Sequence, residues 1–290
     1  MGTDVRHAPE PLGQKLIDAL VRRFDLEATA PQRYRSSPGR GEGIVFGGML
    51  LAQGLVAAGR EANGTPPHAV HAHFLRGARH GTPIDWTVEV VRDGLRFATR
   101  RVIATQREQT VFTMMASFTE PPEDMELTHS DDMPPAPPPE SLPDLEDLRA
   151  EVLGDPSARR PDGPLEAREC DREAAVPAVG RVARRALWMR PRGRLPDSPL
   201  VHAAMVAFAS DRGLLSTAAR PHGLMWGARQ GASLDHALWL HRPWRFEDWV
   251  LCTSESPVAV GGRALVLASM YGRDGTRIAT IAQEGLVRRR

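Results

Sequence analysis

The chain has 290 residues, enough for two domains that could each bury a core of their own. Its composition, 41% hydrophobic and 25% charged residues, is that of a globular protein and excludes a disordered or fibrous one. The net charge of +1 supplies no overall field that would draw the chain to nucleic acid or to a membrane surface, so we expect neither as a partner.

Targeting and redox signals are also lacking. Cys170 and Cys252 lie far apart and fit neither a metal-binding nor a redox spacing, which favours a reducing compartment. The first residues, Met1 to Leu12, are polar and lack the apolar core of a signal peptide. No apolar run approaches the roughly 18 residues of a membrane span. We therefore expect a cytoplasmic protein without a membrane span.

The first half of the chain predicts two helices followed by a sheet. Apolar residues recur at helical spacing from Gly13 to Phe24, and an extended segment, Asp25 to Arg35, follows. A glycine-rich stretch, Ser37 to Gly48, leads to a helix from Met49 to Gly59 with an inner face of small residues. Alternating β-branched and aromatic residues, with a turn at Asp93-Gly94, then predict four strands: Ala69 to Leu75, Ile84 to Arg92, Phe97 to Thr105 and Val111 to Phe118.

Prolines cluster from Glu120 to Asp144, too densely for a helix or a central strand, and indicate an interdomain linker. Beyond it a helix is predicted from Ser198 to Leu215, with Asp197 or Ser198 as N-cap and Pro199 in the first turn. Four strands follow again, with a tight turn at Asp274-Gly275: Ala232 to Leu240, Asp248 to Glu255, Arg263 to Tyr271 and Ile278 to Val287.

The two halves thus share one order of elements. Overlaying them also matches single residues: His71, Phe74 and Leu75 with His236, Trp239 and Leu240, and Asp85-Trp86 with Asp248-Trp249. Such an overlay indicates a gene duplication. A helix with a small inner face can lie close against an antiparallel sheet, which is the hotdog arrangement. We predict an α+β fold of two tandem hotdog domains, residues 1–119 and 148–290, joined by a linker at 120–147.

Three polar residues of the second half are candidates for chemistry. Asp211 continues the apolar stripe of the predicted helix, where a carboxylate loses hydration and needs partners. Ser233 begins a predicted strand, and Gln283 lies among alternating apolar residues of the last one. Each also has a structural interpretation: a solvated aspartate, a hydroxyl bonded to backbone, and a buried amide that satisfies a neighbour.

Other kinds of site find little support. The sequence has no Gly-x-Ser-x-Gly elbow, phosphate-binding Walker loop or dinucleotide fingerprint, so we expect no cofactor. His71 and His73 share a strand face but lack the further ligands of a metal site, so packing in the core or a cleft is favoured and no metal is expected. His236 and His241 are interpreted as structural histidines.

Several separated motifs, taken in order, resemble the acyl-CoA thioesterase II family of double-hotdog thioesterases. They cover most of the chain, and the motifs are Val45-Phe46-Gly47-Gly48, His73-Phe74-Leu75-Arg76, Ala116-Ser117-Phe118, Phe208-Ala209-Ser210-Asp211, Leu234-Asp235-His236 with Trp239, His241-Arg242-Pro243, and Gln283-Glu284-Gly285. The resemblance implies a catalytic set of an aspartate, a threonine or serine, and a glutamine, which fall on Asp211, Ser233 and Gln283. It also implies an acyl-CoA substrate. Gly47 and Gly48 are candidates for close backbone approach to that substrate or for a tight strand-to-helix turn, and His73 is a further substrate-binding candidate.

The chemistry of a thioester agrees with this set. Its carbonyl is electrophilic and its thiolate leaves readily, so a positioned water with a carboxylate to accept its proton is sufficient. We expect an acyl-CoA hydrolase that uses Asp211 as base, and that associates further as a homodimer or larger homo-oligomer. Two alternatives remain open: a hotdog-fold enoyl-CoA hydratase, and an acyl-CoA-binding protein without activity.

Overall fold

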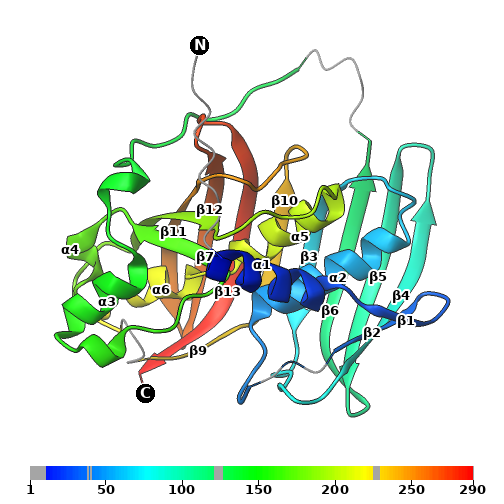
Figure 1. Cartoon of the computed structure of the whole chain (residues 1–290), viewed down its shortest axis with the longest axis horizontal. Coiled ribbons are helices and arrows are strands. Elements are labelled where there is room, and N and C mark those ends of the chain that lie inside the picture. The colour runs from blue at the N-terminus through cyan, green and yellow to red at the C-terminus, as the bar shows by residue number, and fades with distance from the viewer. Residues whose placement is uncertain (1–10, 38, 40, 121–126, 225–228, 290) are drawn as a thin grey trace.

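The described residues form one antiparallel sheet of 13 strands, against which the main helices pack (Figure 1). The computed structural model describes residues 11–37, 39, 41–120, 127–224 and 229–289. Within these residues no helix is long and apolar enough to cross a membrane.

The first half contains the predicted helices and all four predicted strands. The expected extended segment forms a short hairpin, β1 and β2, and the turn between β5 and β6 places Arg107 and Glu108 at positive φ. The elements are α1 (Pro11–Phe24), β1 (Glu27–Ala30), β2 (Arg33–Ser36), α2 (Gly47–Arg60), β3 (Pro67–Phe74), β4 (Ile84–Asp93), β5 (Phe97–Gln106) and β6 (Gln109–Thr119).

The second half repeats this order with additional elements before its main helix. Those elements are η1 (Pro139–Ser141), α3 (Leu145–Leu153), η2 (Pro156–Ala158), β7 (Leu165–Glu169), α4 (Arg172–Ala175) and β8 (Arg184–Pro191). The remainder comprises α5 (Pro199–Ser210), α6 (Leu214–Ala219), β9 (Arg229–Ser233), β10 (Asp235–Leu240), β11 (Val250–Val260), β12 (Arg263–Gly272) and β13 (Arg277–Arg289).

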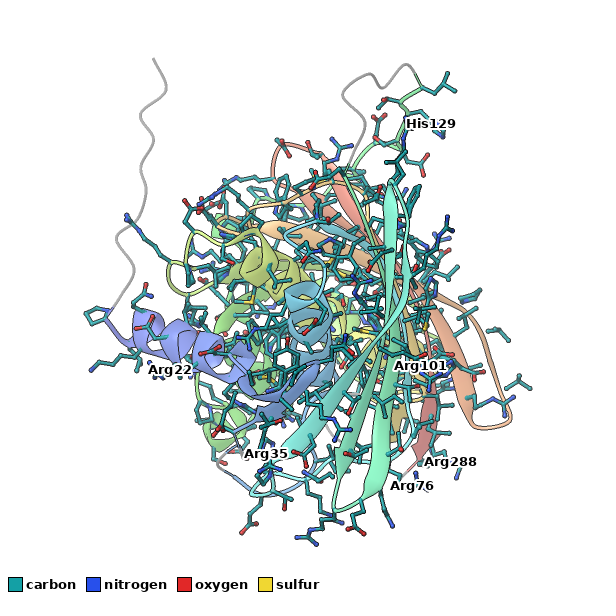
Figure 2. The ribbon with its side chains drawn as sticks, turned by 90° about the vertical axis from the view of Figure 1, so that its right-hand side faces the viewer. Arg22, Arg35, Arg76, Arg101, His129 and Arg288 are labelled. Atoms are coloured by element: carbon teal, nitrogen blue, oxygen red, sulfur yellow. The ribbon has the colours of Figure 1, made fainter. Side chains whose placement is uncertain are left out.

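The strand order mirrors itself about the centre of the sheet: β1-β2-β4-β5-β6-β3-β10-β13-β12-β11-β8-β7, with β9 beside β13. The central pair, β3 and β10, joins the two halves, with Ala72 opposite His236. Each half wraps around its own helix, α2 or α5, and both helices lie on the same face of the sheet (Figure 1). Seen from its edge, the sheet has α1, α2 and α5 on one side and Arg101 on the other (Figure 2). The double-hotdog prediction is confirmed.

The residue-by-residue overlay of the halves is wrong, although the strands correspond. His71 and Trp239 are on the outer face of the sheet, whereas Phe74 and His236 are on the inner one. The overlay therefore matched residues of opposite faces. Side chains alternate with a period of two, so an offset wrong by one residue exchanges the faces.

Two predicted elements of the second half are each divided in two. The helix predicted from Ser198 to Leu215 ends at Ser210, and α6 begins after Gly213, whose φ of 84° is left-handed. Glycine adopts this conformation without steric cost, so it permits the sharp break. The strand predicted from Ala232 to Leu240 is interrupted between β9 and β10. The predicted cap is confirmed, because the Ser198 side chain accepts from the Val201 amide at 3.4 Å.

The proline-rich segment covers the outer face of the second half of the sheet. The Trp188 indole donates to the Pro137 carbonyl at 2.8 Å. Beneath it lies an apolar cluster on the outer face, formed by Trp188, Trp249, Leu251 and Tyr271, to which Met133, Ala136 and Leu142 add. From Met133 onward the predicted linker is therefore packed against the second domain, whereas residues 127–132 are exposed. The predicted boundaries themselves remain predictions.

Substitution of Trp249 tests how much this outer cluster contributes to stability. Its side chain is 2% exposed and the Arg190 guanidinium stacks 4.5 Å from its ring. We expect Trp249→Ala to lower the free energy of unfolding by about 3–5 kcal/mol, because it leaves a large cavity under the proline-rich segment. Denaturant unfolding would measure the loss. Leu95→Ala, at a fully exposed position, is the control and should change stability by less than about 0.5 kcal/mol.

Candidate active site

Helices α2 and α5 run antiparallel and touch at both ends. A Cβ at Gly48, in the first turn of α2, would lie 2.4 Å from the Phe208 carbonyl oxygen near the end of α5. A Cβ at Gly59, in the last turn of α2, would lie 2.4 Å from a Leu200 methyl at the start of α5. A side chain at Gly48 would strike the backbone of α5, whereas one at Gly59 would require the Leu200 side chain to shift. The N-terminus of α2 thus lies against the C-terminus of α5.

Asp211 occupies this contact. It is the C-cap residue of α5, it is 8% exposed, and its Oδ2 accepts a hydrogen bond from the Gly48 amide at 2.9 Å. The C-terminal end of its own helix is the negative end of the dipole and disfavours a carboxylate there. The N-terminal end of α2 has the opposite sign and offers its unpaired amides. Helix α2 therefore supplies the hydrogen-bond donor and the positive dipole end that stabilise the Asp211 carboxylate, which α5 does not.

Ser233 and Gln283 lie beside this carboxylate. The Ser233 hydroxyl donates to Asp211 Oδ1 at 3.2 Å, and Gln283 Nε2 donates to Ser233 Oγ at 3.0 Å. Ser233 is the last residue of β9, and Gln283, 1% exposed, points inward from β13. Three side chains that are remote in sequence are thus in one hydrogen-bonded group, in which the Ser233 hydroxyl bonds to side chains rather than to backbone.

The group continues into the protein through His236. Gln283 Oε1 lies 2.5 Å from His236 Nδ1, and His236 Nε2 lies 2.9 Å from Ser210 Oγ. Burial lowers the pKa of His236 to about 4, against a smaller raising effect of the bond to Gln283. The imidazole is therefore neutral at neutral pH, so one of its nitrogens carries a proton and the other accepts.

A large cavity opens beside this group. Its volume is about 950 Å³, and Gly47, Asp211 and Ser233 all border it. Gln283 does not border it among the described residues and lies behind Ser233. Much of the remaining wall is apolar and comes from both halves of the chain: Leu50, Phe74, Leu165, Leu187 and Phe208. The cavity therefore has an apolar part next to Asp211 and Ser233, and further charged side chains elsewhere along its wall, among them Arg76, Arg185 and Arg192.

Of the three predicted substrate-binding residues, Gly47 and Gly48 lie at the site and His73 does not. Gly47 borders the cavity, and a Cβ there would lie 2.7 Å from Asp211 Oδ2, so the absence of a side chain keeps the carboxylate accessible. Gly48 holds Asp211 through its amide. His73 is exposed on the outer face of β3, opposite Asp235, and is not part of the cavity wall. Among the described residues, no contact connects His73 with the site.

His236 and Ser210 are the members of the group that sequence reasoning missed. His236 was interpreted as a structural residue, and Ser210 was considered only as part of a motif. A signal was present, since His236 alternates with Leu238 and Leu240 and therefore belongs to the inner face of its strand. A histidine on a buried face needs hydrogen-bond partners, and the inward amide of the next strand is the nearest candidate.

The opposite contact of α2 and α5 has a different chemistry. There Glu61 is the C-cap residue of α2, and its backbone carbonyl accepts from Arg100 Nε and Nη2 at 2.9 and 2.6 Å. Arg100 is 1% exposed, and the Glu61 carboxylate is hydrogen-bonded by the Tyr34 hydroxyl. The C-terminal end of α2 is therefore capped by a buried cation from β5 of its own half.

Known proteins share this fold and resemble this chain in sequence. The family models for the N-terminal and C-terminal domains of acyl-CoA thioesterases match residues 36–119 and 130–287. Acyl-coenzyme A thioesterase 8 of Mus musculus is 33% identical over 84% of this chain and 80% of its own length. Acyl-CoA thioesterase 2 of Haemophilus influenzae is 32% identical over 94% and 98%. The crystal structure of an acyl-CoA thioesterase II from Mycobacterium marinum superposes with a TM-score of 0.77, at 34% identity over 93% and 98%.

The fold, the cavity and these relatives define the class of the protein as a double-hotdog acyl-CoA thioester hydrolase. The chain belongs to the acyl-CoA thioesterase II family. The relatives are thioesterases by name, so the two alternatives, a hydratase and a protein without activity, are not supported.

Burial of His236 makes stability depend on pH. A histidine in the unfolded chain binds a proton near pH 6.5, whereas His236 in the folded protein does so only near 4. Between these values the unfolded state binds more protons, so the free energy of unfolding falls as pH falls, by up to roughly 3 kcal/mol. Denaturant unfolding at a series of pH values would measure the change.

Comparison with variants isolates this contribution from that of other titrating groups. His236→Gln should show a shallower loss of stability between pH 6.5 and 4 than the wild type. His129→Gln, in an exposed segment, should leave the wild-type dependence unchanged. Identical pH dependence in His236→Gln and the wild type would contradict the buried neutral imidazole.

Proposed function

We propose that the protein hydrolyses acyl-CoA by direct attack of a water molecule activated through Asp211, Ser233 and Gln283. The single observation that carries this proposal is the hydrogen-bonded group of these side chains at the wall of the large cavity. Asp211 and Ser233 border the cavity and would contact the water. Gln283 would act through the Ser233 hydroxyl, because it lies behind that residue.

In the proposed reaction the water oxygen attacks the thioester carbonyl carbon while Asp211 accepts one of the water's protons. The tetrahedral intermediate collapses with cleavage of the carbon–sulfur bond, and the coenzyme A thiolate receives the proton from Asp211. The products are a free carboxylic acid and coenzyme A. The first turn of α2 is the proposed source of oxyanion stabilisation, since Gly47 borders the cavity and an amide at this position lacks a partner within its own helix.

The apolar wall supports an acyl group as the part of the substrate held next to Asp211. Leu50, Phe74, Leu187 and Phe208 would bury its hydrocarbon, which contributes about 0.8 kcal/mol per CH₂ group removed from water. The volume of about 950 Å³ is sufficient for more than an acyl chain alone. The cavity thus accommodates both an acyl group and part of the coenzyme.

A cytoplasmic location is part of the same proposal. It is supported by the two cysteines, which form no disulfide: Cys252 is buried and Cys170 partly so. Burial raises the pKa of each thiol to about 12, so neither is a reactive thiolate at neutral pH.

Asp211→Asn tests the proposed base. The amide keeps the size of the side chain but cannot accept the water's proton, so we expect kcat for thiol release to fall about 10²- to 10⁴-fold. The assay should follow free thiol with acyl-CoA substrates from short to long chains. Asp18→Asn is the matched control, because it makes the same change at an exposed position on α1.

The control should retain wild-type turnover. A kcat for Asp211→Asn within a factor of ~10 of the wild type would show that another group accepts the proton. Circular dichroism and thermal unfolding of both variants should confirm that the fold is retained, because Asp211 also accepts the bond from the Gly48 amide.

A further inference from the structure

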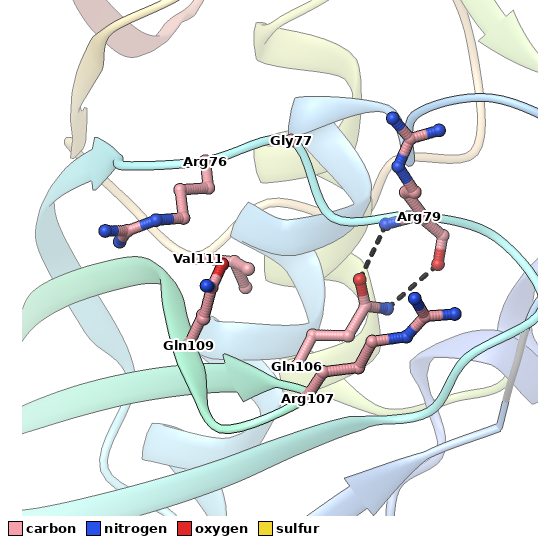
Figure 3. Close-up of a pocket in the computed structure, with 7 residues that line it drawn as sticks. All are labelled: Arg76, Gly77, Arg79, Gln106, Arg107, Gln109 and Val111. Atoms are coloured by element: carbon pink, nitrogen blue, oxygen red, sulfur yellow. Dashed lines mark hydrogen bonds between the residues drawn. The ribbon is translucent and has the colours of Figure 1, made fainter.

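A second, smaller pocket adjoins the active-site cavity and is lined by arginines. Its volume is about 300 Å³, and its wall includes Arg76, Arg79 and Arg107 (Figure 3). Arg76 comes from the segment after β3, Arg79 lies three residues further on, and Arg107 belongs to the turn between β5 and β6. Figure 3 shows Arg79 and Arg107 on one side of this pocket and Arg76 on the other. Among the residues that the structure describes, no carboxylate belongs to the lining.

The lack of acidic partners distinguishes this pocket from the rest of the cavity region. At the cavity wall, Arg192 pairs with Asp144 at 2.7 Å, and Arg185 pairs with the buried Glu169 at 2.7 Å. The guanidinium of Arg76 donates to the Thr110 carbonyl, which is a neutral partner. Three arginines thus border a concave surface whose described lining has no carboxylate. Their guanidinium groups point in different directions (Figure 3), and rotation of these exposed side chains would bring their charge to an anion bound there.

The loop that carries Arg79 is held in place by a buried amide. Gln106, 8% exposed, accepts from the Arg79 amide at 2.8 Å and donates to the Arg79 and Thr82 carbonyls at 2.9 Å each. Three hydrogen bonds from one side chain fix the backbone of this loop relative to β5. The side of the pocket formed by Arg79 is therefore preorganised, which reduces the entropic cost of binding a ligand there.

This pocket adjoins the active-site cavity, because Arg76 and Gly77 border both. Phe74, two residues before Arg76, lies beside Gly47 and so close to Asp211. Two residues of extended chain span roughly 7 Å, so the arginines begin a short way along the cavity from the proposed reaction centre. A substrate with its reactive carbonyl at Asp211 and an anionic group at the end of a linear arm would fit both regions.

We propose that the pocket lined by Arg76, Arg79 and Arg107 binds the phosphate groups of the nucleotide part of the substrate. This assignment rests on the proposed function, because it takes coenzyme A as the leaving group. Guanidinium groups recognise phosphate through paired hydrogen bonds, and their charge is independent of pH in the physiological range. These three arginines would contribute to binding of the substrate rather than to the chemical step.

The test compares one acyl group carried on coenzyme A, on 3′-dephospho-coenzyme A and on N-acetylcysteamine, which has no phosphate. The variant carries Arg76→Gln, Arg79→Gln and Arg107→Gln. We expect it to lower the ratio of kcat/KM for the coenzyme A ester to that for the N-acetylcysteamine ester roughly 10-fold or more, mostly through KM. High salt should lower the same ratio in the wild type. The dephospho ester shows whether the 3′-phosphate or the diphosphate is bound.

A matched control removes three positive charges elsewhere. Arg35, Arg101 and Arg263 are half-exposed, pair with carboxylates and line neither cavity. Their combined change to Gln should retain the wild-type ratio. An unchanged ratio in the pocket variant, or an equal loss in the control, would overturn the pocket assignment. Failure of the wild type to hydrolyse any of the three esters would instead overturn the proposed function.

A second inference follows from the direction of the hydrogen bonds behind Asp211. An ionised Asp211 needs a donor from Ser233, so the Ser233 oxygen must accept from Gln283 Nε2. Gln283 Oε1 then faces His236 Nδ1, which must carry the proton. Nε2 must accept the single hydroxyl proton of Ser210, which is then directed away from the Ala207 carbonyl 2.9 Å from the Ser210 oxygen. Each bond fixes the direction of the next.

The opposite imidazole tautomer would reverse this chain. With the proton on Nε2, His236 would donate to Ser210, whose hydroxyl would donate to the Ala207 carbonyl at 2.9 Å. Nδ1 would then require the amide nitrogen of Gln283, and the amide oxygen would take the Ser233 proton. Ser233 would present only lone pairs to Asp211. We infer that His236 is a positioning residue, which through the Gln283 amide keeps the Ser233 proton directed at Asp211.

Two substitutions of His236 separate positioning from packing. In His236→Asn the side-chain amide can replace the Nδ1 donor to Gln283, whereas His236→Gln places its amide near the Nε2 position, toward Ser210. We expect His236→Gln to lower kcat roughly 10- to 100-fold with little change in KM, and His236→Asn to retain most of the activity. Equal losses in the two variants would overturn the inference.

Nitrogen NMR of the wild type provides a direct readout of the tautomer. The proton of His236 should reside on Nδ1 at neutral pH. Ser210→Ala removes the partner of Nε2 but keeps the bond from Nδ1 to Gln283, so the proton should stay on Nδ1 in this variant. A proton on Nε2 in the wild type would overturn the inference.

Discussion

The contact between the C-terminal end of α5 and the N-terminal end of α2 is the constraint on which the site depends. Gly48 permits it, because a side chain there would strike the Phe208 carbonyl. The same glycine donates its amide to Asp211, a carboxylate that its own helix disfavours. One half of the chain thus supplies the carboxylate and the other half supplies the dipole and amide that hold it. Neither half contains a complete site alone.

Behind this contact, the sheet holds the hydrogen-bonded group in one geometry. The group runs from Ser210 through His236, Gln283 and Ser233 to Asp211. Gln283 projects from β13 and His236 from β10, two strands paired through Ala282 and Ala237. The amide and the imidazole therefore have little freedom to move relative to each other. Residues on regular strands give a more rigid site than residues on loops, which agrees with the proposed role of one positioned water.

The fold could be predicted from the sequence because its signals are local and repeated. Helical spacing and strand alternation predicted α1, α2 and the eight main strands, although the strand predicted from 232 to 240 is divided. The break at Gly213 was not predicted, because the sequence does not show whether a glycine within a helical pattern adopts a helical or a left-handed φ. To predict which residues of β3 and β10 point inward, the register must be known to the residue, and an approximate overlay of the two halves does not give it. The resemblance to the family predicted Asp211, Ser233 and Gln283 as one set. It could not predict the hydrogen bond from Gly48 to Asp211 or the position of Gln283 behind Ser233, because both depend on how segments distant in sequence are placed in the fold.

The buried cation at Arg100 shows what fusion of two domains into one chain makes possible. In a dimer of identical domains both helix contacts would be related by symmetry, and every substitution would appear in each. In a fused chain the two can diverge independently. Here one contact holds a carboxylate beside an open cavity, and the other has Arg100 bound to the Glu61 carbonyl. The C-cap residues of the two helices have thus diverged: Asp211 borders the cavity, whereas Glu61 is held by Arg100 and Tyr34 of its own half.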